Sequence, residues 1–165
     1  MEVSVKKLEK YVGYGGEYID HCNKFHVDNK SSDDTDYLCV MGYYVIAIPK
    51  NKIRFGDALV TCQQLKLEDK IIDAAEDAEY ELEYGGLESD FNNTKKVACR
   101  FKNPKGEDIY VNRTFFTEFM NRAFSATGGF AKGVTFTGSN NRSPVLMWDA
   151  EENLVGMFMP MVKNR

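Results

Sequence analysis

The sequence predicts an α+β fold with a mainly antiparallel sheet and two or three helices, folded as a single compact domain over residues 1–165. Two observations lead to this prediction. Short runs of alternating apolar and polar residues are joined by turn sequences, which favours antiparallel strand pairing. Other stretches repeat apolar residues at helical spacing. A chain of 165 residues with 43% hydrophobic content is also long enough to bury one core.

The amino-terminal third predicts one helix and two strands. Apolar residues at helical spacing predict a helix over Ser4–Val12, which the glycine-rich residues 13–16 should end. Polar residues predict an exposed loop at 28–36. Aromatic and β-branched residues then predict strands at Tyr37–Met41 and Tyr43–Pro49.

The middle of the chain predicts helix and then strand. Asp57 is a suitable N-cap, and helical spacing continues through residues 57–78 as one long helix or two short ones. From Glu79 to Tyr84 glutamates alternate with apolar residues, which is the period of a half-buried strand. We expect Gly85–Gly86 to end this strand.

The clearest local signal is a β-hairpin. Apolar residues alternate before and after Asn103–Gly106, where proline and glycine occupy the second and fourth positions of a type I turn. A helix beginning at Asn112 or Thr114 and ending near Ser125 is expected next, because one face would be broadly apolar. That face comprises Phe115, Phe116, Phe119, Met120, Ala123 and Phe124. Three strands should complete the fold: Gly133–Thr137, Val145–Trp148 and Leu154–Val162.

Composition predicts a cytoplasmic protein without a membrane span. The longest apolar run, Tyr43–Pro49, is far shorter than the roughly 18 residues that a spanning helix needs. The start of the sequence lacks the apolar segment of a signal peptide. The four cysteines are widely spaced and are expected to be reduced thiols: Cys22, Cys39, Cys62 and Cys99.

One cluster of residue types is compatible with metal binding or catalysis. His21, Cys22, His26 and Cys39 include the side chains that zinc prefers, and Cys22 with His26 contains a nucleophile and a base. Their spacing matches no standard zinc motif. We therefore expect no cofactor and no enzymatic activity, and keep an enzyme or metal site at His21, Cys22 and His26 as an alternative.

The most uneven feature of the sequence is the distribution of charge along it. Residues 68–90 contain ten acidic residues and one basic residue, a net charge of −9, whereas the whole chain carries −4. This segment is either a solubilising surface or a surface that binds a basic protein, of which a nucleic-acid-binding protein is one example. Direct binding to nucleic acid is not expected, because the basic residues form no comparable stripe. The candidate partner-binding residues are Asp69, Asp73, Glu76, Asp77, Glu79, Glu81 and Glu83.

The last third of the sequence resembles the closing part of a DNA sliding clamp domain. The resemblance rests on Ile109–Asn112, the apolar stretch Phe115–Phe124, the segment Ser143–Leu146 and the ending Met159–Met161. It implies a strand, an amphipathic helix and three further strands, and a role as a clamp-like replication accessory protein. Clamp inner helices carry basic residues towards DNA, whereas this stretch offers Arg113 and Arg122.

Taken together, the residues favour a non-enzymatic accessory or inhibitor module that binds a partner through an acidic face. Small acidic chains without a catalytic motif are typical of accessory proteins from phages and mobile elements. The clamp-like accessory protein and the site at His21, Cys22 and His26 remain the alternatives.

Overall fold

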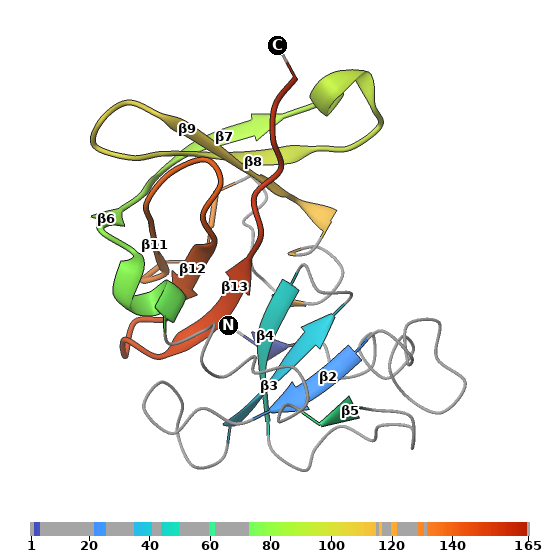
Figure 1. Cartoon of the computed structure of the whole chain (residues 1–165), viewed down its shortest axis with the longest axis vertical. Helices are drawn as coiled ribbons and strands as arrows, with labels where there is room; N and C mark the ends of the chain where they lie inside the picture. Colours follow the sequence, from blue (N-terminus) through green and yellow to red (C-terminus); the bar gives the residue numbers. More distant parts are fainter. Residues whose placement is uncertain are drawn as a thin grey trace.

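The described strands of this protein form three sheets, shown in Figure 1 for the computed structural model. The structure describes residues 2–3, 22–25, 35–40, 44–49, 60–61, 73–114, 116, 120–121, 129–130 and 132–164. The strands of the first part are β1 (Glu2–Val3), β2 (Cys22–Phe25), β3 (Thr35–Val40), β4 (Tyr44–Pro49) and β5 (Val60–Thr61). Those of the second part are β6 (Tyr80–Glu81), β7 (Glu83–Glu88), β8 (Ala98–Lys102), β9 (Asp108–Asn112), β10 (Met120–Asn121), β11 (Thr135–Gly138), β12 (Val145–Trp148) and β13 (Leu154–Phe158). Residues 73–77 are α-helical, and the 3-10 helix η3 spans Phe91–Asn93.

Antiparallel pairing dominates, as the sequence predicts. The largest sheet has eight strands in the order β5-β2-β3-β4-β13-β12-β11-β6, and a second sheet has the order β7-β8-β9. The smallest sheet pairs β1 with β10. Among the described strands, β2 and β5 form the single parallel pair. The strands predicted near β3, β4, β11, β12 and β13 are confirmed, although β13 ends at Phe158 rather than Val162.

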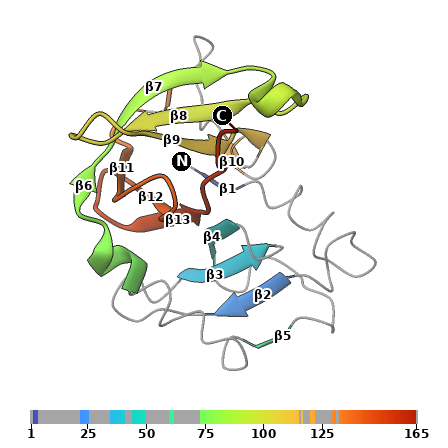
Figure 2. The ribbon, with the colours of Figure 1, turned by 45° about the horizontal axis from the view of Figure 1, so that its top comes forward.

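Aromatic side chains fill the space between the two larger sheets. The three-stranded sheet lies above β11, β12 and β13 in Figure 1 and is seen again in Figure 2. The Phe136 ring is 4.6 Å from that of Phe101 and 4.7 Å from that of Phe130, measured between centroids. Phe116 is fully buried and lies 4.8 Å from Phe158. Tilted and edge-to-face packing of this kind lets the described residues of 73–164 share one core.

β6 and β7 carry the chain from one sheet to the other. β6 pairs with β11, and β7 pairs with β8. The expectation that Gly85–Gly86 ends the strand is wrong, because β7 continues to Glu88 through a β-bulge at this point. Gly86 has φ +102°, a conformation that glycine adopts without the steric cost of a side chain.

The predicted hairpin is confirmed as β8 and β9, and a buried amide fixes its turn. The Asn103 side chain accepts hydrogen bonds from the backbone N–H groups of Lys105 and Glu107, at 3.1 and 3.0 Å. Its amide nitrogen donates to the Ser139 carbonyl at 3.0 Å. Since Asn103 is 5% exposed, these bonds tie the hairpin to the β11–β12 turn.

The carboxy-terminal residues return to the hairpin. The Met161 N–H donates to the Tyr110 carbonyl at 2.7 Å, and Met161 packs against buried Phe91, Ala98 and Tyr110. Lys163 forms an ion pair with Glu88 at 2.7 Å. These contacts explain why β13 ends early: the chain leaves the larger sheet at Phe158 and joins the smaller one.

The number of helices was overestimated. The stretch expected to be helical from Asn112 to Ser125 is helical at Thr114 and Phe116. It also contains β10, which pairs with β1, so the predicted helix cannot run through Met120 and Asn121. Likewise, Val60 and Thr61 belong to β5, so the helical pattern of residues 57–78 is not one long helix; its end is confirmed as helix at 73–77. In both cases pairing with a distant strand overrides local spacing.

Two further predictions fall partly or wholly outside the described residues. The helix expected at Ser4–Val12 lies outside them. Of the loop expected at 28–36, Thr35 and Asp36 belong instead to β3. Among the residues that the structure describes, no helix has the length and apolar character needed to cross a membrane.

Candidate protein-binding surface

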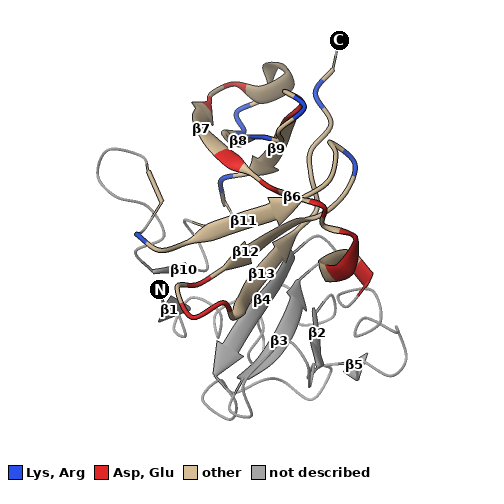
Figure 3. Ribbon diagram, turned by 90° about the vertical axis from the view of Figure 1, so that its left-hand side faces the viewer, with Lys and Arg blue, Asp and Glu red and all other residues tan. Residues whose placement is uncertain are grey.

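Six carboxylates lie along one side of the molecule on consecutive elements. All six side chains are exposed, and Figure 3 shows acidic residues along the helical segment, β6 and the start of β7. We call this surface the acidic edge; its members are Asp73, Glu76, Asp77, Glu79, Glu81 and Glu83. The seventh candidate, Asp69, lies outside the described residues.

Local periodicity accounts for the exposure of the acidic edge. Between residues 79 and 84 each glutamate is exposed, whereas Leu82 is buried and Tyr80 and Tyr84 are half-buried. Leu82 faces inward because its side chain packs against Gly138: a Cβ at that glycine would lie 2.9 Å from the Leu82 Cδ1. Because the apolar side chains of this segment face inward, the glutamates that alternate with them must face outward.

The carboxylates of the acidic edge are not neutralised within the described part of the chain. The ion pairs found there join Lys102 to Asp108 at 3.8 Å and Lys163 to Glu88 at 2.7 Å. Two lysines lie beside the edge: Lys102 is paired in register with Glu83, and Lys105 contacts Tyr80. The Tyr80 contact raises the pKa of Lys105, and the Glu79 charge adds to this shift. Among the described residues, the carboxylates of the acidic edge therefore keep their negative charge.

The β11–β12 turn borders the acidic edge and holds it in place. The Ser139 hydroxyl donates to the Asp77 carbonyl at 2.5 Å and accepts from the Glu79 N–H at 3.3 Å. These bonds satisfy backbone groups where the helical segment gives way to β6. They also leave an open hollow on each side of Ser139.

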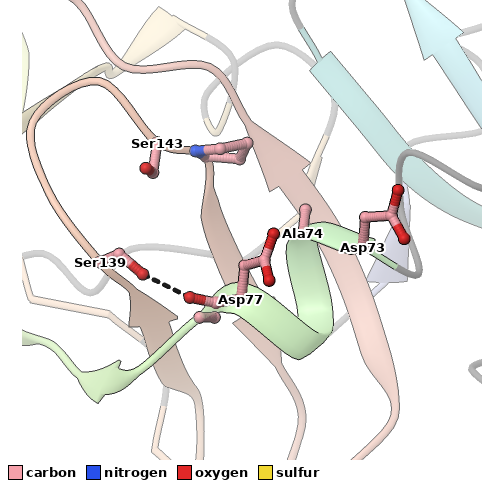
Figure 4. A pocket seen from close by; sticks show the side chains of 7 residues that line it. Asp73, Ala74, Asp77, Ser139 and Ser143 are labelled. Atoms are coloured by element: carbon pink, nitrogen blue, oxygen red, sulfur yellow. Dashed lines mark hydrogen bonds between the residues drawn. The ribbon is translucent and has the colours of Figure 1, made fainter.

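The first hollow lies between the helical segment and the β11–β12 turn (Figure 4). Its volume is about 280 Å³, and its lining combines two carboxylates and two hydroxyls with apolar groups. In Figure 4 the Asp77 carboxylate lies on the same side of the helical segment as the Ala74 methyl, whereas the Asp73 carboxylate points away from Ser143. The lining residues are Asp73, Ala74, Asp77, Ala78, Ser139, Ser143 and Pro144.

The second hollow, of about 400 Å³, is more polar. It lies where the hairpin turn meets Tyr80, and its lining includes both Lys105 and Glu107. Glu107 is already engaged, since it accepts a hydrogen bond from the Asn141 N–H at 3.0 Å. This hollow thus offers no uniform charge to a ligand.

Only Cys22 and Cys39 of the histidine and cysteine cluster belong to the described residues. His21 and His26 lie outside the described residues, and the register of β2 and β3 places Asn23, not Cys22, opposite Cys39. Within the described residues no group of three or more His, Cys, Asp or Glu side chains is placed to hold a metal ion. Cys99 is fully buried, and this burial raises the pKa of its thiol to about 12, so it remains protonated at neutral pH.

The residues missed by sequence reasoning are Ser139, Ser143 and Pro144. They border the acidic edge only because β11 pairs with β6, which brings Ser139 next to Asp77 across 62 positions of the sequence. No local pattern marks such a contact. Comparison of the chain with models of known protein families, with curated proteins and with solved structures finds no match.

Proposed function

We propose that this protein is a non-enzymatic accessory or inhibitor module that binds a basic surface of a partner protein through its acidic edge. The supporting observation is that six exposed carboxylates follow one another along one side with no ion-pair partner among the described residues. Like charges at helical i,i+4 positions cost about 0.2–0.5 kcal/mol per pair. Asp73 and Asp77 have this spacing, so their arrangement does not stabilise the fold.

A basic partner would gain from this arrangement in two ways. Long-range attraction between opposite charges accelerates association, and complementary potentials disfavour acidic competitors. A nucleic-acid-binding protein is the class that best fits, because its phosphate-binding surface is already basic. Nucleic acid itself is not expected to bind at the acidic edge, since phosphates would be repelled there.

A charge-reversal experiment tests the proposal. The test variant carries Glu76→Lys and Glu81→Lys on the acidic edge. The matched control carries Glu151→Lys and Glu152→Lys, two exposed acids of the β12–β13 turn, which Figure 3 shows on the opposite side of the view. Both variants change the net charge equally. Each full-length protein is used to capture proteins from a lysate of its native host at about 50 mM salt.

The parent and the control should retain the same basic protein, and the test variant should lose it. With the purified partner, the association rate should fall in the test variant and depend less steeply on salt than in the parent. Equal retention by all three proteins, or equal loss in test and control variants, would show that the acidic edge is only a solubilising surface.

A further inference from the structure

Residues 161–164, which we call the tail, lie against the three-stranded sheet as a bound peptide would. Figures 1 and 2 show the end of the chain rising from β13 to this sheet. Met161 forms one antiparallel bridge with Tyr110 of β9. The other described contacts of the tail with the sheet and with η3 are made through side chains, so they show which chemistry this surface recognises.

Asn92 recognises the backbone of the tail. Its amide nitrogen donates to the Val162 carbonyl at 2.9 Å, and its carbonyl oxygen accepts from the Asn164 N–H at 2.7 Å. Asn92 has φ +53°, and Asp90 and Asn93 beside it have φ +51° and +59°. Left-handed backbone outside glycine is uncommon and is found at ligand clamps. Because Asn92 bonds to main-chain atoms alone, it can hold any extended segment in the same way.

The first two side chains of the tail differ in how closely the surface contacts them. Met161 packs against the buried residues Phe91, Ala98 and Tyr110. Val162, the next residue, is 59% exposed. The surface therefore selects an apolar residue at the first position and accepts any residue at the second.

The third side chain of the tail satisfies its partner incompletely. The Lys163 Nζ lies 2.7 Å from the Glu88 Oε1 and 5.3 Å from the centroid of the Tyr110 ring. The other oxygen of this carboxylate, Oε2, is buried and has no hydrogen-bond partner among the described residues. A guanidinium group can donate to both oxygens of a carboxylate and also stack on an aromatic ring. Arginine therefore fits this position better than the lysine that the chain itself supplies.

We propose that this surface binds an extended segment of a partner protein in which an apolar residue is followed by any residue and then by arginine. The tail occupies the surface as a built-in competitor. Tethered through Met159 and Pro160, it has an effective concentration on the order of millimolar, which a partner segment overcomes through the better fit of arginine. The inference goes beyond the proposed function, because no residue of the acidic edge takes part. We call the surface the tail site; it comprises Glu88, Phe91, Asn92, Ala98 and Tyr110.

The test uses three blocked hexapeptides with the isotope-labelled full chain. Their sequence is that of residues 159–164, with arginine, lysine or glutamine at the position of Lys163. NMR follows the backbone amide signals of Tyr110 in the tail site and of Met161 in the tail. The arginine peptide should shift the first signal saturably and move the second towards the position of an unstructured chain. The lysine peptide should need about tenfold higher concentrations, because it leaves a buried acceptor unsatisfied, and the glutamine peptide should have no effect.

Lys163→Gln makes the test more sensitive by loosening the tail. The substitution removes the ion pair with Glu88 and leaves the residues of the tail site unchanged. An exposed ion pair contributes about 0–1 kcal/mol, so the arginine peptide should bind this variant at up to about fivefold lower concentration than the parent.

Asn92→Gly and Asn93→Gly, each combined with Lys163→Gln, form a matched pair. Both asparagines have positive φ, which glycine adopts readily, but the tail is bonded to the side chain of Asn92 and not to that of exposed Asn93. Asn92→Gly should weaken binding of the arginine peptide by about tenfold, and Asn93→Gly should leave it unchanged. Thermal unfolding shows whether each variant is folded; if Asn92→Gly is not, the order of the three peptides decides.

Three results would overturn the inference. The first is an arginine peptide that shifts no signal of the tail site in the parent or in Lys163→Gln, which would make the tail a fixed part of the sheet. The second is equal binding of the arginine and lysine peptides, and the third is equal binding by the folded Asn92→Gly and Asn93→Gly variants. None of these results bears on the charge-reversal experiment, which changes other residues, so the tail site and the acidic edge can fail separately.

Discussion

Polar and ionisable side chains have opposite roles in two neighbouring regions of this molecule. In the hairpin region, formed by β8, β9, the turn between them and residues 161–164, such groups are engaged by the fold: the Asn103 side chain makes three hydrogen bonds, and Lys163 binds Glu88 at the end of β7. On the acidic edge, six exposed carboxylates have no described ion-pair partner. The two regions meet at Ser139, which bonds to both.

This difference separates residues that hold the structure from residues available to a partner. Changing a polar group in the hairpin region should reduce stability, because a buried group loses its partner. Changing a carboxylate of the acidic edge should leave stability nearly unchanged. Experiments that make equivalent substitutions in both regions can test whether their effects on stability differ in this way.

The largest effect is expected for Asn103→Ala. This substitution leaves the N–H groups of Lys105 and Glu107 and the Ser139 carbonyl without their present partner. An unsatisfied buried group costs about 1–3 kcal/mol, so a loss of about 3 kcal/mol is expected. Chemical denaturation measures it. The same substitution at exposed Asn141 is the control and should change stability by less than about 0.5 kcal/mol; equal losses at both sites would contradict the role given to Asn103.

A smaller effect is expected from raising the pH. Burial raises the pKa of the Cys99 thiol from its ordinary 9.0 to about 12. Above pH 9 the thiol ionises first in the unfolded chain, so the stability contributed by the neutral thiol is complete below pH 9 and is lost between pH 9 and about 12. Between about pH 8.5 and 10.5 the parent should lose roughly 1–2 kcal/mol for this reason.

The control for the pH experiment is Cys99→Ala, measured by denaturation over the same range. Its stability should be lower than that of the parent at neutral pH, since a fully buried side chain is shortened. Its decline with pH should be shallower, because the ionising group is gone. Parallel declines in the two proteins would mean that Cys99 does not govern the alkaline loss.

Sequence reasoning succeeded where the information is local. The turn Asn103–Gly106 and the alternation around it are contained within a few residues, so the hairpin was predicted correctly. The same holds for the exposure of Glu79, Glu81 and Glu83, because neighbouring apolar side chains face the core.

It failed where distant segments decide the outcome. The pairing of β10 with β1 joins Met120 to Val3, and nothing in the apolar stretch around Met120 reveals that partner. Glycine pairs are equally ambiguous: Gly85–Gly86 was expected to end a strand, but the pair forms a bulge inside β7. The hollow beside Ala74 could not be foreseen either, since Pro144 reaches it through the fold of the sheet.

The smallest expected effect is also the most direct comparison of the two regions. Glu88→Gln and Glu81→Gln remove one negative charge each from strands that are consecutive in the chain, the first from an ion pair and the second from the acidic edge. Glu88 is bonded to Lys163 at 2.7 Å, and this contact raises the pKa of Lys163. An exposed ion pair contributes about 0–1 kcal/mol, so Glu88→Gln should lower stability within that range. Glu81→Gln should leave stability unchanged or raise it by a few tenths of a kcal/mol, because it relieves repulsion. Denaturation at about 50 mM and about 500 mM salt checks the cause, since screening should reduce both effects. A loss of stability in Glu81→Gln as large as that in Glu88→Gln would mean that the acidic edge supports the fold, and the case for keeping it free for a partner would fail.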